Sequence, residues 1–135
     1  MNKPIVMIVD DDTEIRVGLR YYLEARGFHV VVAMDGQQGL KEFRESPKPP
    51  QVVVLDLRMP NQGGLSFLHE LKKEKVPPKV IVVTGLTGDT VEQAVEGYGA
   101  AKLLAKPVPL SVVEGAIREV LGKERLLRPP EAASQ

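Results

Sequence analysis

Six polar residues that could bind a cation or an anion follow directly after short apolar segments of the chain. Three aspartates follow the first segment, one aspartate follows another, and a threonine and a lysine follow two later ones: Asp10, Asp11 and Asp12; Asp56; Thr84; and Lys106. Short continuous apolar runs are typical of buried parallel strands, and ligands of open α/β sheets bind at the carboxyl ends of such strands. One site could therefore bring together carboxylates, a hydroxyl and an ammonium group.

The segments that must position these residues alternate between strand and helix patterns. Apolar runs predict strands over residues 5–9, 28–33, 51–55, 79–83 and 101–105. Apolar and small residues recur at helical spacing after each of them, in five groups: Ile15, Leu19, Tyr22 and Leu23; Gly36, Leu40 and Phe43; Leu65, Leu68 and Leu71; Val91, Ala94, Val95 and Tyr98; and Val113, Ala116, Ile117, Val120 and Leu121. Five such units predict an α/β fold, a three-layer sandwich whose parallel sheet is covered by helices on both faces.

Local signals mark several helix ends. Gly27 stands where the first helix should stop, and Asp35 can cap the second helix. Asp12 and Glu14 are best explained as acidic residues that favour the first turn of a helix, and not as ligands. His29 and His69 have no partner at metal-ligand spacing, so we expect them to be structural or exposed.

Length and composition limit the function. With 135 residues the chain has the size of one domain, and equal numbers of basic and acidic residues, 18 of each, give no global field for nucleic acid or anionic lipid. The chain has no cysteine and no apolar run long enough for a signal peptide or a membrane span, so a cytoplasmic protein is expected.

Residues 1–122 are predicted to form the domain, and residues 123–135 a tail. The last helix is expected to fray near Gly122, although a short extension to Leu127 would keep its apolar residues on one face. Thirteen residues are too few for a DNA-binding module. Output is therefore expected through contact with a protein, with no direct binding of nucleic acid or membrane.

In this layout the residues closely resemble the receiver domain of two-component response regulators, including the stand-alone chemotaxis type. The resemblance covers roughly residues 4–122 and depends on five separated matches: Asp10-Asp11, Asp56 in Leu55-Asp56-Leu57-Arg58-Met59-Pro60, Gly63-Gly64, Thr84-Gly85, and Lys106-Pro107. Each match is weak alone, but their order and their placement at strand ends are specific. The family implies a flavodoxin-like, doubly wound sheet with strand order 2-1-3-4-5.

The resemblance also implies a role for each site residue. Asp56 would accept a phosphoryl group from the phosphohistidine of a histidine kinase or phosphotransfer protein. Mg²⁺ would be held by Asp11 and Asp56 directly, by Asp10 mainly through water, and by the backbone carbonyl of Arg58. Three carboxylates, Mg²⁺ and the Lys106 ammonium sum to zero charge, which predicts that phosphorylation depends on the metal.

A switch function would follow from this chemistry. Lys106 and Thr84 would donate to the phosphoryl group, and the signal would pass to the surface of helix four, strand five and helix five. The protein would be a phosphoacceptor regulator, with self-catalysed phosphotransfer and self-dephosphorylation but no ordinary enzymatic turnover. It would act as a monomer or as a phosphorylation-dependent dimer.

Three positions depart from the family pattern. Leu103 stands where many receivers have an aromatic residue that rotates on activation, so coupling to the output could differ. Arg58 and Leu86 occupy the positions that influence the access of water to the acyl phosphate, and neither offers a carboxylate or amide to position that water. We therefore expect slow self-dephosphorylation.

Two alternatives belong to other functional classes. The first is an aspartate-nucleophile phosphatase of the haloacid dehalogenase type, since Asp10 and Asp12 are acids two residues apart after the first strand. That motif requires Thr or Val at position 14, where this chain has Glu14, and no cap insertion is evident. The second is a receiver-like scaffold that binds partners without phosphorylation, although the intact set of site residues argues against it.

Overall fold

The computed structural model describes residues 3–58, 63–86 and 88–126, and within them five strands alternate with five helices. The strands are β1 (Ile5–Val9), β2 (His29–Ala33), β3 (Val52–Leu55), β4 (Lys79–Thr84) and β5 (Lys102–Ala105). The helices are α1 (Thr13–Ala25), α2 (Gly36–Glu45), α3 (Gly64–Leu71), α4 (Asp89–Gly97) and α5 (Leu110–Leu126). All paired strands are parallel and their order is β2-β1-β3-β4-β5, which confirms the predicted topology.

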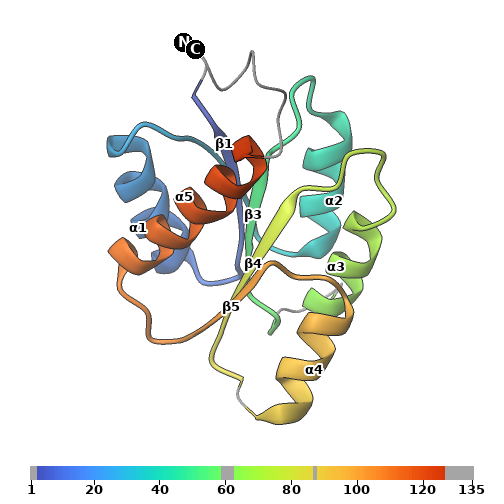
Figure 1. The fold of residues 1–135 in the computed structure, drawn as a ribbon. Helices are drawn as coiled ribbons and strands as arrows, with labels where there is room; N and C mark the ends of the chain where they lie inside the picture. The colour runs from blue at the N-terminus through green and yellow to red at the C-terminus, as the bar shows by residue number, and fades with distance from the viewer. Residues whose placement is uncertain (1–2, 59–62, 87, 127–135) are drawn as a thin grey trace.

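Helices cover both faces of the sheet, with α1 and α5 on one face and α2, α3 and α4 on the other (Figure 1). Alternate residues of each strand therefore enter different cores. Val6 and Ile8 pack under α1 and α5, whereas Met7 and Val9 pack under the opposite helices. Burial on both faces explains why β1 is a continuous apolar run and not an alternating one.

The strand order brings the ends of β1 and β3 together. Val9 is paired with Leu55, and each is followed directly by an aspartate. The N–H of Asp56 donates to the Val9 carbonyl at 3.0 Å, and the N–H of Asp10 donates to the Ala33 carbonyl at 3.2 Å. Hydrogen bonding between strands thus continues one residue beyond β1 and β3 and fixes the backbone of both aspartates.

The helix ends predicted at Asp12, Gly27 and Asp35 are confirmed. Asp12 is the N-cap of α1, and its Oδ1 accepts from the N–H groups of Glu14 at 2.9 Å and Ile15 at 3.2 Å. Asp35 caps α2 by accepting from the N–H of Gln38 at 2.9 Å. Gly27 has a φ of +98° just after α1, a conformation that glycine adopts at little cost.

Two helices differ from the expected lengths. Tyr98 is the C-cap of α4 and 39% exposed, so it is not part of the buried helix face. Helix α5 continues past Gly122 to Leu126, and the expected fraying near Gly122 is wrong. A glycine inside a helix costs only about 1 kcal/mol, which the burial of Val120 and Leu121 can offset. Leu127 lies outside the described residues, so the boundary between domain and tail remains a prediction.

None of the described helices is long and apolar enough to cross a membrane.

Candidate functional site

Three aspartates form an acidic cluster at the carboxyl ends of β1 and β3. Asp10, Asp11 and Asp56 each offer a carboxylate oxygen, and these oxygens all lie within 4.8 Å of one another. Asp10 and Asp56 are 4% and 7% exposed, whereas Asp11 is exposed to solvent. The cluster therefore has two fixed, buried acids and one acid at its open side. Asp12 is turned to the start of α1 instead, as predicted.

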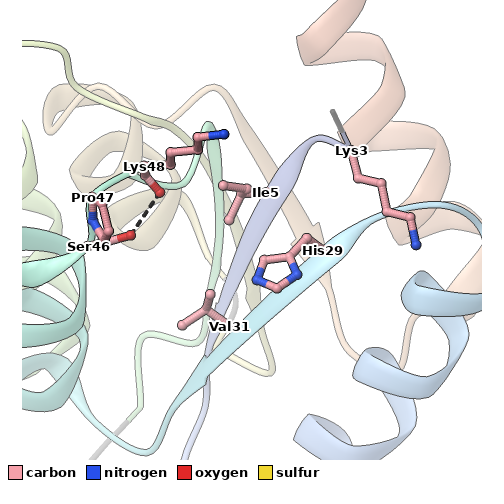
Figure 2. A pocket seen from close by; sticks show the side chains of 7 residues that line it. All are labelled: Lys3, Ile5, His29, Val31, Ser46, Pro47 and Lys48. Carbon is pink, nitrogen blue, oxygen red and sulfur yellow. Dashed lines mark hydrogen bonds between the residues drawn. The ribbon is translucent and has the colours of Figure 1, made fainter. Parts of the chain in front are cut away.

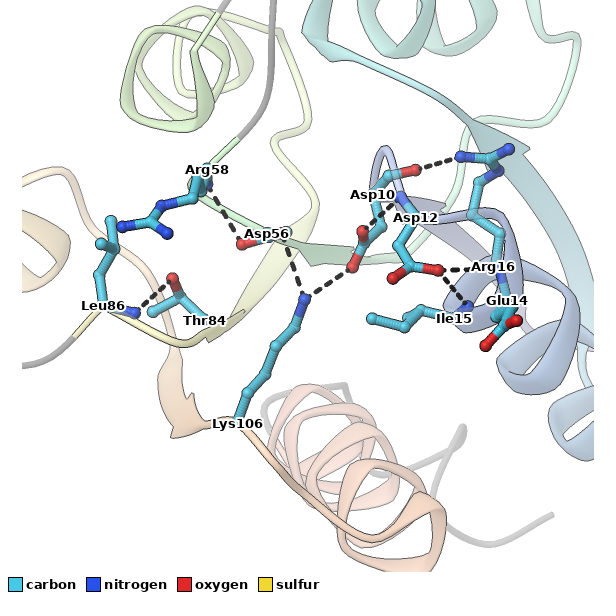
Figure 3. A network of polar contacts seen from close by, with 10 residues as sticks. All are labelled: Asp10, Asp12, Glu14, Ile15, Arg16, Asp56, Arg58, Thr84, Leu86 and Lys106. Atoms are coloured by element: carbon cyan, nitrogen blue, oxygen red, sulfur yellow. Dashed lines mark hydrogen bonds and ion pairs between the residues drawn. The ribbon is translucent and has the colours of Figure 1, made fainter.

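Lys106 lies between the two buried acids (Figure 3). Its Nζ is 3.1 Å from Asp10 Oδ2 and 3.2 Å from Asp56 Oδ2, and its side chain is 24% exposed. Burial alone would lower the pKa of Lys106, but the hydrogen bonds and negative charges of Asp10 and then Asp56 outweigh it and raise the pKa. The ammonium group is therefore charged at neutral pH and partly neutralises the cluster.

Asp10 is held at both carboxylate oxygens. Its Oδ2 meets Lys106, and its Oδ1 accepts from the N–H of Asp12 at 2.9 Å. Burial raises the pKa of the Asp10 carboxyl, and the hydrogen bonds from Asp12 and Lys106 offset only part of this effect. A buried carboxylate in this position is stabilised by any further positive charge that binds beside it.

Asp56 is held in a similar way on β3. Its Oδ2 meets Lys106, and its Oδ1 accepts from the N–H of Arg58 at 3.2 Å. The Arg58 side chain is exposed. In Figure 3 it extends on the side of Asp56 where Thr84 and Leu86 lie, away from Asp10. Both carboxylate oxygens of Asp56 are therefore held, one by Lys106 and the other by the backbone of Arg58.

Thr84 is fully buried at the end of β4. Its hydroxyl oxygen accepts from the N–H of Leu86 at 3.2 Å, and its carbonyl accepts from the N–H of Lys106 at 2.9 Å. The second bond links the ends of β4 and β5 through the backbone. Thr84 and Lys106 are thus brought to the same end of the sheet as the aspartates, as the strand pattern predicted.

The donor set suits Mg²⁺. This ion prefers oxygen ligands in an octahedral arrangement and usually keeps several waters, so a few carboxylates at an open edge are sufficient. The oxygens of Asp10, Asp11 and Asp56 meet this requirement, and the exposed Asp11 leaves the cluster open to solvent.

Neither histidine belongs to the acidic cluster. His69 is exposed and its ring packs at a steep angle against that of Tyr98, with ring centroids 5.7 Å apart.

His29 lies at the opposite end of the sheet, where it lines a hollow of about 600 Å³ with Lys3, Ile5, Val31, Ser46, Pro47 and Lys48 (Figure 2). This hollow is larger than the pocket of about 430 Å³ that Lys106 lines, but it is formed by the first residues of β1 and β2 and by the loop after α2. The acidic cluster follows the last residues of β1 and β3. Cavity size therefore does not identify the site in this protein.

One residue beside the cluster was not anticipated from the sequence. Arg16, on the first turns of α1, donates from Nη1 to the main-chain carbonyl of Asp10 at 2.6 Å (Figure 3). The sequence shows only that Arg16 follows Asp10 by six residues, and the structure adds that this residue of α1 is half-buried. A bond from a side chain to a backbone carbonyl leaves no pattern of paired residue types.

A five-stranded parallel sheet in this order, with acids, a threonine and a lysine gathered at its carboxyl edge, defines a doubly wound α/β protein whose site can bind a cation and an anion together. The chain matches the family model of the response regulator receiver domain over residues 6–118. It belongs to this family, whose members are signalling regulators of two-component systems.

Individual relatives agree with this assignment. The response regulator RR06 of Streptococcus pneumoniae serotype 2 is 32% identical over 116 residues, which is 86% of this chain and 52% of that protein. The chain thus spans about half the length of this curated relative. A response regulator receiver domain protein from Clostridium thermocellum is 30% identical with a TM-score of 0.83, over 93% of this chain and 99% of that one. A CheY-like receiver domain protein from Methanospirillum hungatei JF-1 is 26% identical with a TM-score of 0.85, over 90% and 96% of the two chains.

Proposed function

We propose that this receiver domain is a phosphorylation-controlled switch in which Asp56 accepts a phosphoryl group from the phosphohistidine of a histidine kinase or phosphotransfer protein. The observation that carries the proposal is the setting of Asp56. Its carboxylate is buried, bonded to Lys106 and to the Arg58 N–H, and flanked by two further acids. A buried aspartate with only a structural role would need one counter-ion, here Lys106. It would not need two further carboxylates beside it.

The proposed transfer exchanges one bond to phosphorus for another. A carboxylate oxygen of Asp56 forms a bond to phosphorus as the bond from phosphorus to the donor imidazole nitrogen breaks, and that nitrogen keeps the electron pair and takes a proton. A bound Mg²⁺ would supply the positive charge that lets the anionic donor approach the acids. Asp10, Asp11, Asp56 and the backbone carbonyl of Arg58 are the residues that would hold it.

Lys106 and Thr84 are proposed to respond to the product. Conversion of Asp56 to an acyl phosphate replaces one negative charge by about two and adds acceptor oxygens. The Lys106 ammonium already lies 3.2 Å from Asp56 and can follow the new charge. The Thr84 hydroxyl, which now accepts from Leu86, can donate its own proton to a phosphoryl oxygen and move the loop after β4 with it.

The output surface is proposed to be formed by α4, β5 and α5. This surface is continuous with the loop that follows Thr84, and every residue of β5 is at least partly exposed at the sheet edge. Leu103 is partly buried on the α4 side of the sheet, where it packs against the core. Because Leu103 has no aromatic ring, the proposed movement of the loop after β4 must reach the output surface through aliphatic packing and through that loop itself.

The use of Asp12 as a cap weighs against the phosphatase alternative. In that mechanism the second acid must be free to exchange a proton with the substrate. Here one Asp12 oxygen accepts two backbone N–H groups of α1. Its carboxylate is therefore turned to the helix and not to the acidic cluster.

The test is an intact-mass measurement after incubation of the full chain with acetyl phosphate or phosphoramidate, with and without Mg²⁺. The proposal expects one added phosphoryl group only with Mg²⁺, lost in Asp56→Asn and kept in the matched control Asp12→Asn, which removes a neighbouring charge but can still cap α1. A chain that stays unmodified under all conditions would be a phosphorylation-independent scaffold. Steady hydrolysis of a generic phosphomonoester, abolished by Asp12→Asn, would support the phosphatase instead.

A further inference from the structure

Arg16 connects helix α1 to the loop that carries the acidic cluster. Its Nη1 donates to the main-chain carbonyl of Asp10 at 2.6 Å, and its Nη2 donates to Thr13 Oγ1 at 3.1 Å. Its own backbone N–H donates to the Asp12 carbonyl at 3.1 Å. One side chain thus spans the segment from Asp10 to Thr13 and ties it to the helix.

The Asp10 carbonyl lies where pairing between strands ends. The N–H of Asp10 still bonds to β2, through the Ala33 carbonyl at 3.2 Å, but β2 stops at Ala33. The Asp10 carbonyl receives the Arg16 guanidinium instead. Hydrogen bonds from charged donors are shorter and stronger than neutral ones, in agreement with the 2.6 Å distance. Arg16 therefore fixes the plane of the peptide bond between Asp10 and Asp11.

The orientation of this peptide plane matters most for Asp11. The side chain of Asp10 is held independently by Asp12 and Lys106. Asp11 is exposed, and among the described residues no hydrogen bond or ion pair holds its carboxylate. The backbone on which Asp11 stands therefore limits where its carboxylate can reach. If the peptide plane turns, the Asp11 carboxylate turns away from Asp10 and Asp56.

We propose that Arg16 is a positioning residue for divalent cation binding, which acts by holding the backbone between Asp10 and Asp11 so that the Asp11 carboxylate stays directed at the cluster. This inference rests on the proposed function, because it takes the acidic cluster to be the Mg²⁺ site. Partners that orient metal ligands typically change metal affinity by about 10- to 100-fold when they are removed. The lower end is expected here because Arg16 orients only one of the three acids.

Charge alone predicts the opposite effect. A guanidinium beside an acidic cluster repels an incoming cation, so its removal should tighten Mg²⁺ binding if positioning plays no part. The sign of the change therefore separates the two explanations.

The experiment is a Mg²⁺ titration of the full chain followed by amide shifts in ¹H–¹⁵N spectra, since the protein has no tryptophan for fluorescence. Arg16→Met is expected to weaken Mg²⁺ binding about 10-fold. Arg16→Lys, which keeps the charge but replaces the planar guanidinium and its two separate donor nitrogens with a single ammonium, should fall between Arg16→Met and wild type. Thr13→Val, which removes only the second contact of Arg16, should produce a smaller change in the same direction.

The matched control is Arg20→Met, one turn further along α1. Arg20 is paired with Glu24 at 3.4 Å on the exposed side of the helix, and its loss should leave the Mg²⁺ affinity unchanged. In a second measurement, phosphorylation by acetyl phosphate, Arg16→Met should need more Mg²⁺ for half-maximal rate but reach the wild-type rate at saturation. A merely structural role would lower the saturated rate as well.

The outcomes separate this inference from the function on which it rests. Wild-type protein that shows no Mg²⁺-dependent shifts and takes no phosphoryl group would overturn the proposed function itself. If wild type binds Mg²⁺ and both Arg16 variants bind it equally well or more tightly, only the positioning role is refuted. If Arg16→Met does not fold, Arg16→Lys and Thr13→Val still decide the question, since each retains part of the bridge.

Discussion

Gly64 offers the sharpest test of how closely the structure around Asp56 is packed. This residue begins α3, and a Cβ atom placed on it would overlap Leu57 Cα and lie 2.9 Å from the Asp56 carbonyl oxygen and 3.0 Å from the Leu57 carbonyl carbon. All three atoms belong to the backbone, so no change of rotamer can make room. The Gly64 N–H also donates to the Leu57 carbonyl at 3.2 Å, which holds the two segments together. Gly64→Ala must therefore move α3 or the residue that follows Asp56.

The expected cost can be estimated from two opposing effects. Insertion of a methyl group into a well-packed region costs about 1–3 kcal/mol, and contact with backbone places Gly64→Ala at the upper end. Replacement of glycine by alanine restricts the unfolded chain and returns up to about 1 kcal/mol. The free energy of unfolding should fall by about 2 kcal/mol, a substantial part of the roughly 5–15 kcal/mol typical of a domain.

Urea unfolding of the full chain provides the measurement. With a slope of about 2 kcal/mol per molar urea, a loss of about 2 kcal/mol lowers the midpoint by about 1 M. Gly18→Ala is the matched control, because Gly18 lies inside α1 and a Cβ atom placed on it would meet no described atom within 4 Å. This control should raise stability by about 0.5–1 kcal/mol. A Gly64→Ala midpoint equal to or above that of wild type, with the control behaving as expected, would show that the close approach of α3 does not exist in solution.

Three further predictions concern the N-cap of α1, the dependence of stability on low pH and the lifetime of the acyl phosphate. Asp12→Ala should lower the free energy of unfolding by about 1 kcal/mol, measured by urea unfolding, while phosphorylation is retained. The hydrogen bond from Arg118 lowers the pKa of Glu114, so Glu114 stabilises the fold above its ordinary pKa and loses this effect as pH falls through the lowered value. The free energy of unfolding of Glu114→Gln should accordingly fall less steeply than that of wild type as the pH is lowered. The same pH dependence in both proteins would contradict this. Purified phosphorylated protein should survive for minutes or longer by intact mass, because neither Arg58 nor Leu86 carries a carboxylate or amide that could position an attacking water. A half-life of seconds would reject that view.

The fold and the placement of the main candidate residues were predictable because burial on both faces of a parallel sheet leaves a strong pattern. Each strand is a continuous apolar run, and the first polar residue after it marks the edge at which ligands bind. Asp10, Asp56, Thr84 and Lys106 are all placed in this way, and the parallel sheet brings them to one edge. The pairing of Lys106 with both acids was not predictable from spacing, since it depends on the path of the chain after β5.

Contacts made to the backbone leave a weaker pattern in the sequence than buried strands do. The pair Gly63-Gly64 matched the family pattern, but the sequence does not show which glycine is required. A Cβ on Gly64 would meet the backbone of Leu57, whereas a Cβ on Gly63 would meet none of the described atoms within 4 Å. Arg16 was missed for the same reason, because its acceptor is a carbonyl that every residue carries. The length of α5 was underestimated because a single glycine is a weak stop signal when the residues before it are buried.

If Thr84 responds to the phosphoryl group as proposed, its present hydrogen bond limits how strongly phosphorylation can bias the loop after β4. Its hydroxyl now accepts from the Leu86 N–H, a bond between neutral groups that is worth about 0.5–1.5 kcal/mol. A bond donated to a charged phosphoryl oxygen is worth about 1.5–3 kcal/mol, so the exchange favours the moved loop by about 1 kcal/mol. That difference favours the moved loop about fivefold after phosphorylation, because about 1.4 kcal/mol corresponds to a factor of ten. Before phosphorylation the bond from Leu86 favours the resting loop to a similar degree. Both loop positions should then be populated before and after phosphorylation, and the Leu86 amide should show exchange broadening in each state. A single sharp resonance in both states would mean that the loop does not respond to Thr84, and that the signal leaves the site by another route.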